Sequence, residues 1–284
     1  MFKTIFLTGS GGFVGRNLKE YFQDSYNILC PRSQELDLTD KESVKWYFKS
    51  NRIDFIIHCA STGGVRNCAD PVNCEKDNIL MVNNLCESKN EETRLILFGS
   101  GAAYSKNRNL HKVKELQIGD VIPDDLYGKS KMKLAQLAAI REDVLCLNIF
   151  ACYGKYEKES RFPTYAIMQN LKKEPIVINR NVIFDYLYIS DLCRIVEKFI
   201  VKFPVNKVIN VTPTNSISLY EIAGIINEIS GFESKISFKE QGLNFEYTGD
   251  NSLLKQEIPD FEFTSYKDGL LKLYEFYKLS EKIS

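Results

Sequence analysis

The chain has 284 residues, of which 44% are hydrophobic and 26% charged, a composition that suits one large or two modest globular domains with a buried core. Lysine plus arginine and aspartate plus glutamate number 37 each, so no net charge favours binding to nucleic acid or to an anionic membrane. No apolar run approaches the roughly 18 residues of a membrane-spanning helix and no signal-peptide pattern is present, so we expect a cytoplasmic protein with a small-molecule partner.

The eight cysteines and two histidines give little support for disulfides or for a metal site. No CxxC pair occurs, and several cysteines lie inside apolar segments. The only histidines are His58 and His111, which is too few for a typical zinc site. We therefore expect reduced thiols, no metal, and a packing role for His58.

Short apolar runs alternate with amphipathic stretches of helical length along the first part of the chain. The predicted strands are KTIFLT, YNILC, DFIIHCA, RLILFGS and VLCLNIF, and the helices between them include FVGRNLKEYF and YGKSKMKLAQLAAI. Strand and helix in alternation predict a parallel sheet covered on both faces, an α/β fold of the doubly wound Rossmann type.

The alternation loosens after about residue 155. Helices are expected near 163–173, 190–202 and 218–230, with short strands between them. We assign 1–155 to a Rossmann domain that binds the cofactor. Residues 156–284 form mainly a smaller, interleaved α/β region for substrate, and segments at about 176–211 are expected to return to the first domain.

The first predicted strand leads into TGSGGFVG, residues 8–15, with Gly9, Gly12 and Gly15 in a GxxGxxG spacing. A glycine turn between a strand and a helix lets backbone N–H groups and the helix N-terminus approach a pyrophosphate, because no Cβ stands in the way. The turn, with Phe13 and Val14 at the start of the helix, predicts a dinucleotide site.

The second predicted strand ends in CPRS, where an NAD site of this type would carry an acid for the ribose 2′-hydroxyl. Arg32 stands there instead, and an arginine suits a 2′-phosphate, so NADP(H) is favoured. A solvated loop arginine is the alternative. Further on, Asp37, followed by Leu38, is a candidate for the adenine amino group, although it could also cap a helix, a role that suits Asp40 better.

Tyr127 and Lys131 are four residues apart in YGKSK, so on a helix they share one face. Taken alone, this spacing is typical of a surface pair. The motifs TGSGGFVG, DLTD, LFGSGAAY and YGKSK, however, follow the order found in the extended short-chain dehydrogenase/reductases, a family of sugar-nucleotide epimerases, dehydratases and reductases. The chain resembles that family well over about residues 2–200.

The resemblance implies a catalytic triad of Ser100, Tyr127 and Lys131. Tyr127 would protonate a carbonyl oxygen as hydride arrives from the nicotinamide, and a nearby ammonium lowers the pKa of a phenol. Lys131 would supply that charge and hold the nicotinamide ribose, while Ser100 would hydrogen-bond the reacting oxygen.

Further cofactor contacts are expected after the third strand. They involve Cys59, Ala60 and Ser61, together with Asn78 in a helix from about Pro71 to Lys89. In the family, the asparagine that aligns with Asn78 helps to hold the active-site region. A buried polar residue of the core is the alternative for Asn78.

Within the family, the pattern is closest to the GDP-fucose synthase-like ketoreductases. SGAAY lacks the Asp-Glu pair of the 4,6-dehydratases. Ala102 stands where epimerising members carry a cysteine, and KESRFPTY lacks their downstream histidine, so we expect reduction without epimerisation.

Two positions that usually bind the substrate in the family are also changed. Phe184 replaces an arginine for the pyrophosphate, and Ala151 replaces an asparagine. Arg161 or Arg180 could substitute, since the arginine fork suits phosphate oxygens, although both could be solvated surface residues. Ala102, Arg161 and Arg180 are therefore the candidates for contact with substrate.

The resemblance implies NADPH-dependent reduction of the 4-keto group of a nucleoside-diphosphate 4-keto-6-deoxy sugar, or a related keto sugar, in bacterial surface glycan biosynthesis. A 4-epimerase that retains NAD and a non-catalytic protein that senses NADP are the alternatives. The resemblance also implies a homodimer through the helices that contain ILMVNNL and LAQLAAI, unless those apolar stripes face only the sheet.

Overall fold

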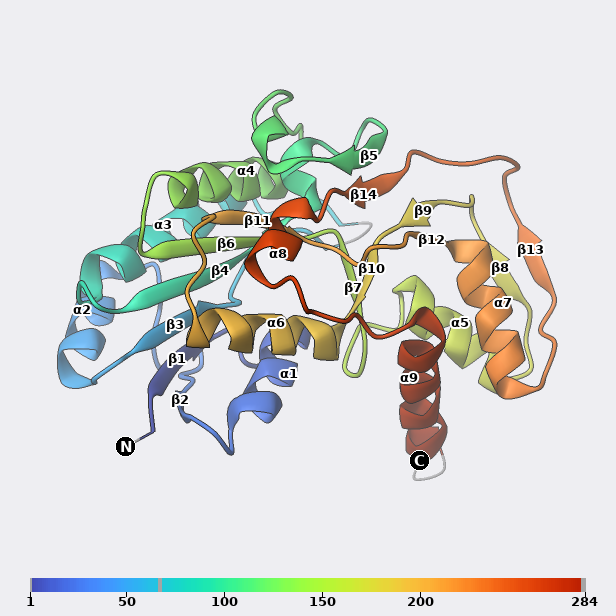
Figure 1. Cartoon of the computed structure of the whole chain (residues 1–284), viewed down its shortest axis with the longest axis horizontal. Coiled ribbons are helices and arrows are strands. Elements are labelled where there is room, and N and C mark those ends of the chain that lie inside the picture. Colours follow the sequence, from blue (N-terminus) through green and yellow to red (C-terminus); the bar gives the residue numbers. More distant parts are fainter. Residues whose placement is uncertain (1, 66–67, 282–284) are drawn as a thin grey trace.

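A six-stranded parallel sheet forms the centre of the computed structural model, which describes residues 2–65 and 68–281 (Figure 1). Its strand order is β11-β6-β4-β3-β1-β2. The strands are β1 (Thr4–Thr8), β2 (Asn27–Leu29), β3 (Phe55–His58), β4 (Arg94–Ser100), β6 (Val144–Ile149) and β11 (Val208–Val211). The predicted doubly wound α/β fold is confirmed.

Both faces of this sheet are buried, which explains why its strands are almost wholly apolar. Leu7, Ile57, Ile96 and Leu145 pair across β1, β3, β4 and β6 and belong to one core cluster. The residues that precede them, Phe6, Ile56, Leu95 and Val144, point to the other face and belong to a second core cluster. Successive side chains of a strand alternate between faces, so a sheet covered twice needs apolar residues at both positions.

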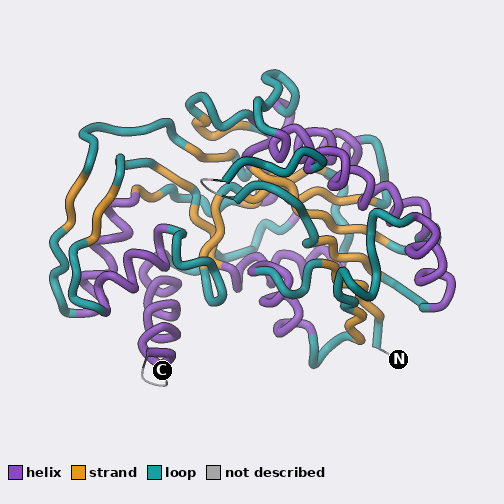
Figure 2. The backbone as a smooth tube through the Cα atoms, turned by 180° about the vertical axis from the view of Figure 1, so that it is seen from behind, coloured by secondary structure: helices purple, strands orange, loops and turns teal. Residues whose placement is uncertain are grey.

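Helices cover the two faces separately, as Figures 1 and 2 show from opposite sides. The first core cluster includes side chains from α1 (Phe13–Phe22) and α6 (Ile189–Val201). The second includes side chains from α2 (Lys41–Ser50), α3 (Cys74–Ser88) and α4 (Leu126–Ala139). The apolar faces of these amphipathic helices thus close the two sides of the sheet.

The smaller region has a core of its own, which packs three helices on two short strands. The helices are α5 (Phe162–Leu171), α7 (Leu219–Ser230) and α9 (Tyr266–Glu281), and the strands are β8 (Ile176–Ile178) and β13 (Ile236–Phe238). It lies beyond the carboxyl ends of the central strands, on the right in Figure 1.

Short strands connect the two regions. A four-stranded sheet has the order β12-β9-β14-β5, and β7 pairs with β10. These strands are β5 (Leu110–Val113), β7 (Ala151–Tyr153), β9 (Ile183–Phe184), β10 (Tyr186–Tyr188), β12 (Ile217–Ser218) and β14 (Tyr247–Gly249). The remaining elements are η1 (Gly101–Tyr104), η2 (Glu115–Gln117) and α8 (Ser252–Glu257).

Some segments of the stretch at about 176–211 were expected to return to the first domain, and the contacts of this stretch divide between the two regions. Its later part does return, because α6 packs on the sheet and β11 pairs with β6. The earlier part does not, because β8 pairs with β13 in the smaller region. Leu254 of α8 also packs in the core of the large sheet, a contact that the sequence pattern did not indicate. Within the described residues, no helix has both the length and the apolar character needed to cross a bilayer.

Candidate active site

The carboxyl ends of β1, β3 and β4 lie at one edge of the sheet, and a predicted site residue is found at or after each end. Gly9 follows β1, Cys59 follows β3, and Ser100 ends β4. In open parallel sheets, ligands bind at this edge, in the crevice beyond the strand ends.

The glycine turn leaves the start of α1 open to an anion. Gly9 has a φ of +65°, and a Cβ there would come within 2.6 Å of the Ala60 nitrogen, so only glycine fits. A Cβ on Gly15 would strike the Gly9 carbonyl oxygen. Gly12 is the N-cap of α1, and no side chain caps the helix by a hydrogen bond. The first turn contains no acidic residue. The free N–H groups and the helix dipole therefore fit the pyrophosphate of a dinucleotide.

Phe13 and Val14 begin α1, and their side chains pack against the first core cluster. Any contact they make with a pyrophosphate therefore comes from their backbone N–H groups. This is consistent with the anion site of a helix N-terminus, where the backbone rather than the side chains carries the donors.

Arg32 is exposed beyond the end of β2. It lies in a turn closed by hydrogen bonds of its own amide and carbonyl groups. Its amide donates to Glu35 Oε2 at 2.6 Å, and its carbonyl accepts from Leu36. Within the described residues its guanidinium forms no salt bridge, so the charge is available to a ligand.

Asp40 is the N-cap of α2, as the sequence indicated, and accepts from Glu42 and Ser43. Asp37 closes a tighter turn, because its Oδ1 accepts from the backbone and hydroxyl of Thr39, each at 2.8 Å. The side chain of Leu38 is buried in the second core cluster. The cofactor contacts of Asp37 and Leu38 stay predictions.

The segment after β3 is tied to the rest of the site by buried polar groups. Ala60 donates its amide to Thr8 Oγ1 at 3.1 Å, which fixes the backbone opposite Gly9. The Thr8 hydroxyl also lies 2.9 Å from His58 Nδ1. Burial and the nearby charge of Lys131 lower the pKa of His58 to about 3, so it is a neutral packing residue.

Asn78 joins the loop after β3 to α4. It is 1% exposed, its Oδ1 accepts from the Thr62 amide at 2.8 Å, and its Nδ2 donates to Ser130 Oγ at 3.1 Å. Ser61 reaches the same Oδ1 at 3.4 Å. Because both amide atoms are used inside the protein, Asn78 holds the active-site segments in place, and a direct cofactor contact stays a prediction.

Tyr127 is fixed at the start of α4. Its amide donates to Asp70 Oδ2 at 2.9 Å, and Asp70 Oδ1 accepts from Gly64 at 2.8 Å. The ring lies against Gly64, where a Cβ would approach it to 2.8 Å and where φ is +68°. This glycine loop therefore holds the phenol at one side of the crevice.

Lys131 is not half of a surface pair. It is 6% exposed, donates to the Phe98 carbonyl at 2.8 Å, and lies with Nζ 5.3 Å from the centroid of the Tyr127 ring. Among the residues that the structure describes, no carboxylate forms an ion pair with it. A buried ammonium without an anionic partner is costly, and such groups are concentrated at functional sites.

Ser100 ends β4 and begins η1, where its Oγ accepts from the Ala102 amide at 3.1 Å. The Tyr247 phenol lies at this end of β4, because a Cβ on the adjacent Gly101 would come within 2.6 Å of Tyr247 Oη. The side chain of Ala102 is buried, so this position offers only a methyl group. Sequence reasoning missed Tyr247, because NFEYTGD contains no motif and only strand pairing brings it here.

Arg161 lies at the N-cap of α5 and is held by a buried acid that sequence reasoning also missed. Glu157 Oε1 is 3.3 Å from Arg161 Nε, and its Oε2 accepts from Thr164 at 3.3 Å. Burial raises the pKa of Glu157 to about 7, although Arg161 and Thr164 act against this rise. The charge of Arg161 also acts on Tyr247, where it opposes the rise in the pKa that burial causes.

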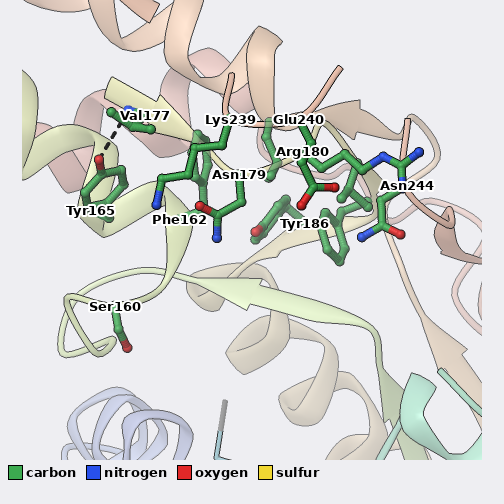
Figure 3. Close-up of a pocket in the computed structure, with 13 residues that line it drawn as sticks. Ser160, Phe162, Tyr165, Val177, Asn179, Arg180, Tyr186, Lys239, Glu240 and Asn244 are labelled. Atoms are coloured by element: carbon green, nitrogen blue, oxygen red, sulfur yellow. Dashed lines mark hydrogen bonds between the residues drawn. The ribbon is translucent and has the colours of Figure 1, made fainter. Parts of the chain in front are cut away.

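A cavity of about 500 Å³ lies next to this crevice in the smaller region (Figure 3). Arg180 is exposed at its wall, close to Glu240 and Asn244. Phe184 also lines it, and the Phe184 ring is 5.8 Å from the ring of Tyr247. The structure thus brings Ser100, Tyr127 and Lys131 together at the carboxyl end of β4 and places Arg180 in a cavity of the smaller region.

Comparisons with known proteins identify the family of the chain. The model of the NAD dependent epimerase/dehydratase family matches residues 5–212. A GDP-L-colitose synthase of Yersinia pseudotuberculosis is 30% identical over 60% of this chain and 59% of its own length, so the chain spans about three fifths of that relative in the match. A GDP-6-deoxy-D-talose 4-dehydrogenase of Aggregatibacter actinomycetemcomitans is 23% identical over 95% of this chain and 97% of its own length.

Among solved structures, the GDP-mannoheptose C4 reductase of Campylobacter jejuni with NADP bound superposes with a TM-score of 0.83 at 21% identity, covering 98% of both chains. This likeness shows that the fold is shared. The family model covers the glycine turn, Ser100, Tyr127 and Lys131, the residues that the fold gathers at one edge of its sheet. The family resemblance drawn from the sequence motifs is thereby confirmed, and the chain belongs to the NAD dependent epimerase/dehydratase family.

Proposed function

We propose that this chain is an NADPH-dependent reductase of the 4-keto group of a nucleoside-diphosphate 4-keto-6-deoxy sugar, or of a related keto sugar. The observation that carries the proposal is the buried Lys131 ammonium, which has no anionic partner among the described residues, lies 5.3 Å from the centroid of the Tyr127 ring and donates to Phe98, two residues before Ser100. A positive charge at this place favours the phenolate that remains after Tyr127 gives up its proton.

Reduced nicotinamide, when bound, supplies the hydride. The glycine turn and the N-terminus of α1 would hold its pyrophosphate, and Arg32 would hold the 2′-phosphate of NADP(H). Ser100 donates a hydrogen bond to the ketone oxygen, and Tyr127 transfers its phenolic proton to that oxygen as the alkoxide forms. Lys131 stabilises the phenolate that is left.

The names of similar proteins support the choice of substrate. The colitose and fucose synthases and the talose dehydrogenase are named for GDP-linked deoxy sugars, and a superposed dTDP-4-dehydrorhamnose reductase of Bacillus anthracis is described in complex with NADP. The crevice beside a 500 Å³ cavity with Arg180 at its wall offers room for a sugar and a nucleotide. We place the reaction in the cytoplasm, in bacterial surface glycan biosynthesis.

The test is to follow NADPH oxidation with GDP-, dTDP-, CDP- and UDP-linked 4-keto-6-deoxy sugars. We expect stoichiometric oxidation with at least one of them. Tyr127→Phe should bind NADPH normally and lower kcat by about 10² to 10⁴, the usual effect of losing a positioned acid. Lys131→Met should weaken both cofactor binding and turnover.

Three outcomes would contradict the proposal. Conversion of the sugar without net NADPH oxidation indicates an epimerase. Tight NADPH binding without conversion of any substrate indicates a cofactor-sensing protein. Turnover by Tyr127→Phe at the wild-type rate shows that the tyrosine is not the proton donor. Arg52→Ala is a suitable control, because its side chain is 83% exposed and lies before β3, at the opposite edge of the sheet.

A further inference from the structure

Asp70 is an acidic residue next to the active site that the proposed reaction does not yet use. It lies between the loop after β3 and the N-terminus of α4, and its two carboxylate oxygens bind to these two segments. Oδ1 accepts from the Gly64 amide at 2.8 Å, and Oδ2 accepts from the Tyr127 amide at 2.9 Å. One side chain thus joins the backbone of Tyr127 to the loop that packs on the Tyr127 ring.

The loop on one side of this carboxylate approaches both the carboxylate and the ring closely. A Cβ on Gly64 would come within 2.8 Å of the Tyr127 ring, and a Cβ on Gly63 would come within 2.7 Å of Asp70 Oδ1. Both glycines have a left-handed backbone, with φ of +78° at Gly63 and +68° at Gly64. Residues with a side chain rarely adopt this conformation, so glycine is needed at both positions. The loop therefore forms a wall for the phenol, and Asp70 fixes that wall.

The helix on the other side begins with amide groups that two different acids accept. Asp125 is the N-cap of α4 and accepts from the Gly128 amide at 2.8 Å, the usual bond of a capping residue. The Tyr127 amide donates instead to Asp70, which comes from a distant segment. Amides at a helix N-terminus have no partner within the helix, and the helix dipole favours a carboxylate there. Both acids therefore stabilise the start of α4, whereas the bonds of Asp70 also set the distance between Tyr127 and the glycine loop.

We infer that Asp70 is a positioning residue of the reductive site: by binding the Gly64 and Tyr127 amides with one carboxylate, it holds the Tyr127 phenol where its proton reaches the ketone oxygen of the substrate. The inference rests on the proposed function. Asp70 itself gives up no proton and takes none, because the proton that reaches the alkoxide comes from Tyr127. Two acceptor oxygens are required, one for each amide. An asparagine of the same shape would place its NH₂ group, which is a donor, against one of them.

The experiment is a double-mutant cycle on kcat with the active 4-keto substrate and NADPH. We expect Asp70→Asn and Asp70→Ala each to lower kcat by about 10- to 100-fold, the scale of a small misplacement of a reacting group, with the NADPH dissociation constant changed less than about threefold. In the Tyr127→Phe background, the same substitutions should change kcat by less than about twofold, because no phenolic proton is left to position. Asp70→Asn keeps the shape of the side chain, so it tests the inference even where Asp70→Ala does not fold.

Asp125→Ala is the matched control. It removes a carboxylate that binds an amide of the same helix end, but the bond of Asp125 to Gly128 lies within the start of α4 and does not involve the glycine loop. The variant should lose thermal stability, as expected for a lost N-cap, and keep kcat within about threefold of the wild type. Circular dichroism and NADPH binding would establish that each variant is folded.

The outcomes separate this inference from the proposed function. Wild-type kcat in Asp70→Asn and Asp70→Ala, with Tyr127→Phe impaired, overturns the inference alone. An equal loss of kcat in Asp125→Ala, or the same loss with and without the Tyr127 hydroxyl, shows a general disturbance of the start of α4 and also overturns it. A wild-type protein that oxidises NADPH with none of the keto sugars overturns the proposed function, and the inference falls with it.

Discussion

Arg32 is the residue on which the choice between the two nicotinamide dinucleotides depends. It follows β2, its own backbone closes the turn around it, and its guanidinium forms no salt bridge within the described residues. The residue was predictable because the fold puts a ribose-binding position at the end of the second strand. Its proposed role as a 2′-phosphate ligand depends on its positive charge. A substitution that removes this charge therefore tests the role.

Arg32→Ala should weaken NADPH binding by about 1.5 to 3 kcal/mol, the scale of a lost charge-assisted hydrogen bond, and leave NADH binding nearly unchanged. Dissociation constants for both cofactors, from fluorescence titration of wild type, Arg32→Ala and Arg52→Ala, would measure this. Arg52→Ala removes the same charge at the far edge of the sheet and should change neither constant. An intrinsic preference of the wild type for NADH would contradict the prediction.

Residues with a local signature could be identified from the sequence, and those without one could not. Tyr127 and Lys131 lie one helical turn apart and Ser100 ends a predicted strand, and the family motifs, rather than the spacing alone, marked them as site residues. Tyr247 reaches the end of β4 only through strand pairing with distant parts of the chain, and Glu157 is buried against Arg161 and Thr164 in a segment without a motif. No periodicity in the sequence encodes such contacts.

The N-terminus of α5 is held by Glu157. Glu157 is buried between Arg161 at the N-cap and Thr164 in the first turn, and its carbonyl accepts from Tyr277 Oη of α9 at 3.4 Å. Burial raises its pKa from 4.5 to about 7. The folded state therefore binds a proton that the unfolded state has already released, so stability falls as pH rises between these two values.

Glu157→Gln should remove this pH dependence, because glutamine keeps the hydrogen bonds and does not ionise. Relative to the variant, the wild type should lose about 1 to 3 kcal/mol of unfolding free energy between about pH 4.5 and 7. Urea unfolding at a series of pH values would measure the difference, with the exposed Glu233→Gln as the control. Parallel curves for wild type and Glu157→Gln would be inconsistent with a raised pKa, and the opposite slope would show that the Arg161 ion pair dominates.

Elements of the large sheet were predictable, whereas the strands that join the two regions were not. The buried strands and the helices around them show strong apolar periodicity. By contrast, β9 and β12 have two residues each and β14 has three, too few for a pattern. They are strands only because each finds a partner, and one of them carries Tyr247.

At the scale of the whole molecule, the open question is what covers the outer surface of α3 and α4, which pack side by side in Figure 1. Much of the apolar stripe expected at a dimer interface is buried within the protomer. Met81, Val82 and Leu85 of α3, like Leu134 and Ala135 of α4, belong to the second core cluster. The alternative that these stripes face the sheet is therefore correct for the inner rows.

An outer row remains at the surface between the two helices. Val72 is 91% exposed, and with Ile79, Leu80 and Leu126 it lines a hollow closed at one side by the ion pair of Glu75 with Lys133, at 2.6 Å. A two-fold dimer would set this surface against its own copy, so that the apolar row of each protomer is buried by the other.

We therefore predict a homodimer through α3 and α4. Light scattering at micromolar concentration should give twice the protomer mass for the wild type. Val72→Glu with Leu80→Glu should give a folded monomer, because burying four like charges in a self-complementary interface is strongly unfavourable. Val201→Glu is the control: Val201 is 76% exposed at the end of α6, on the opposite face of the sheet, so the same new charge should leave the dimer intact. A monomeric wild type would rule out the dimer, and a dimeric double variant would place its interface elsewhere on the molecule.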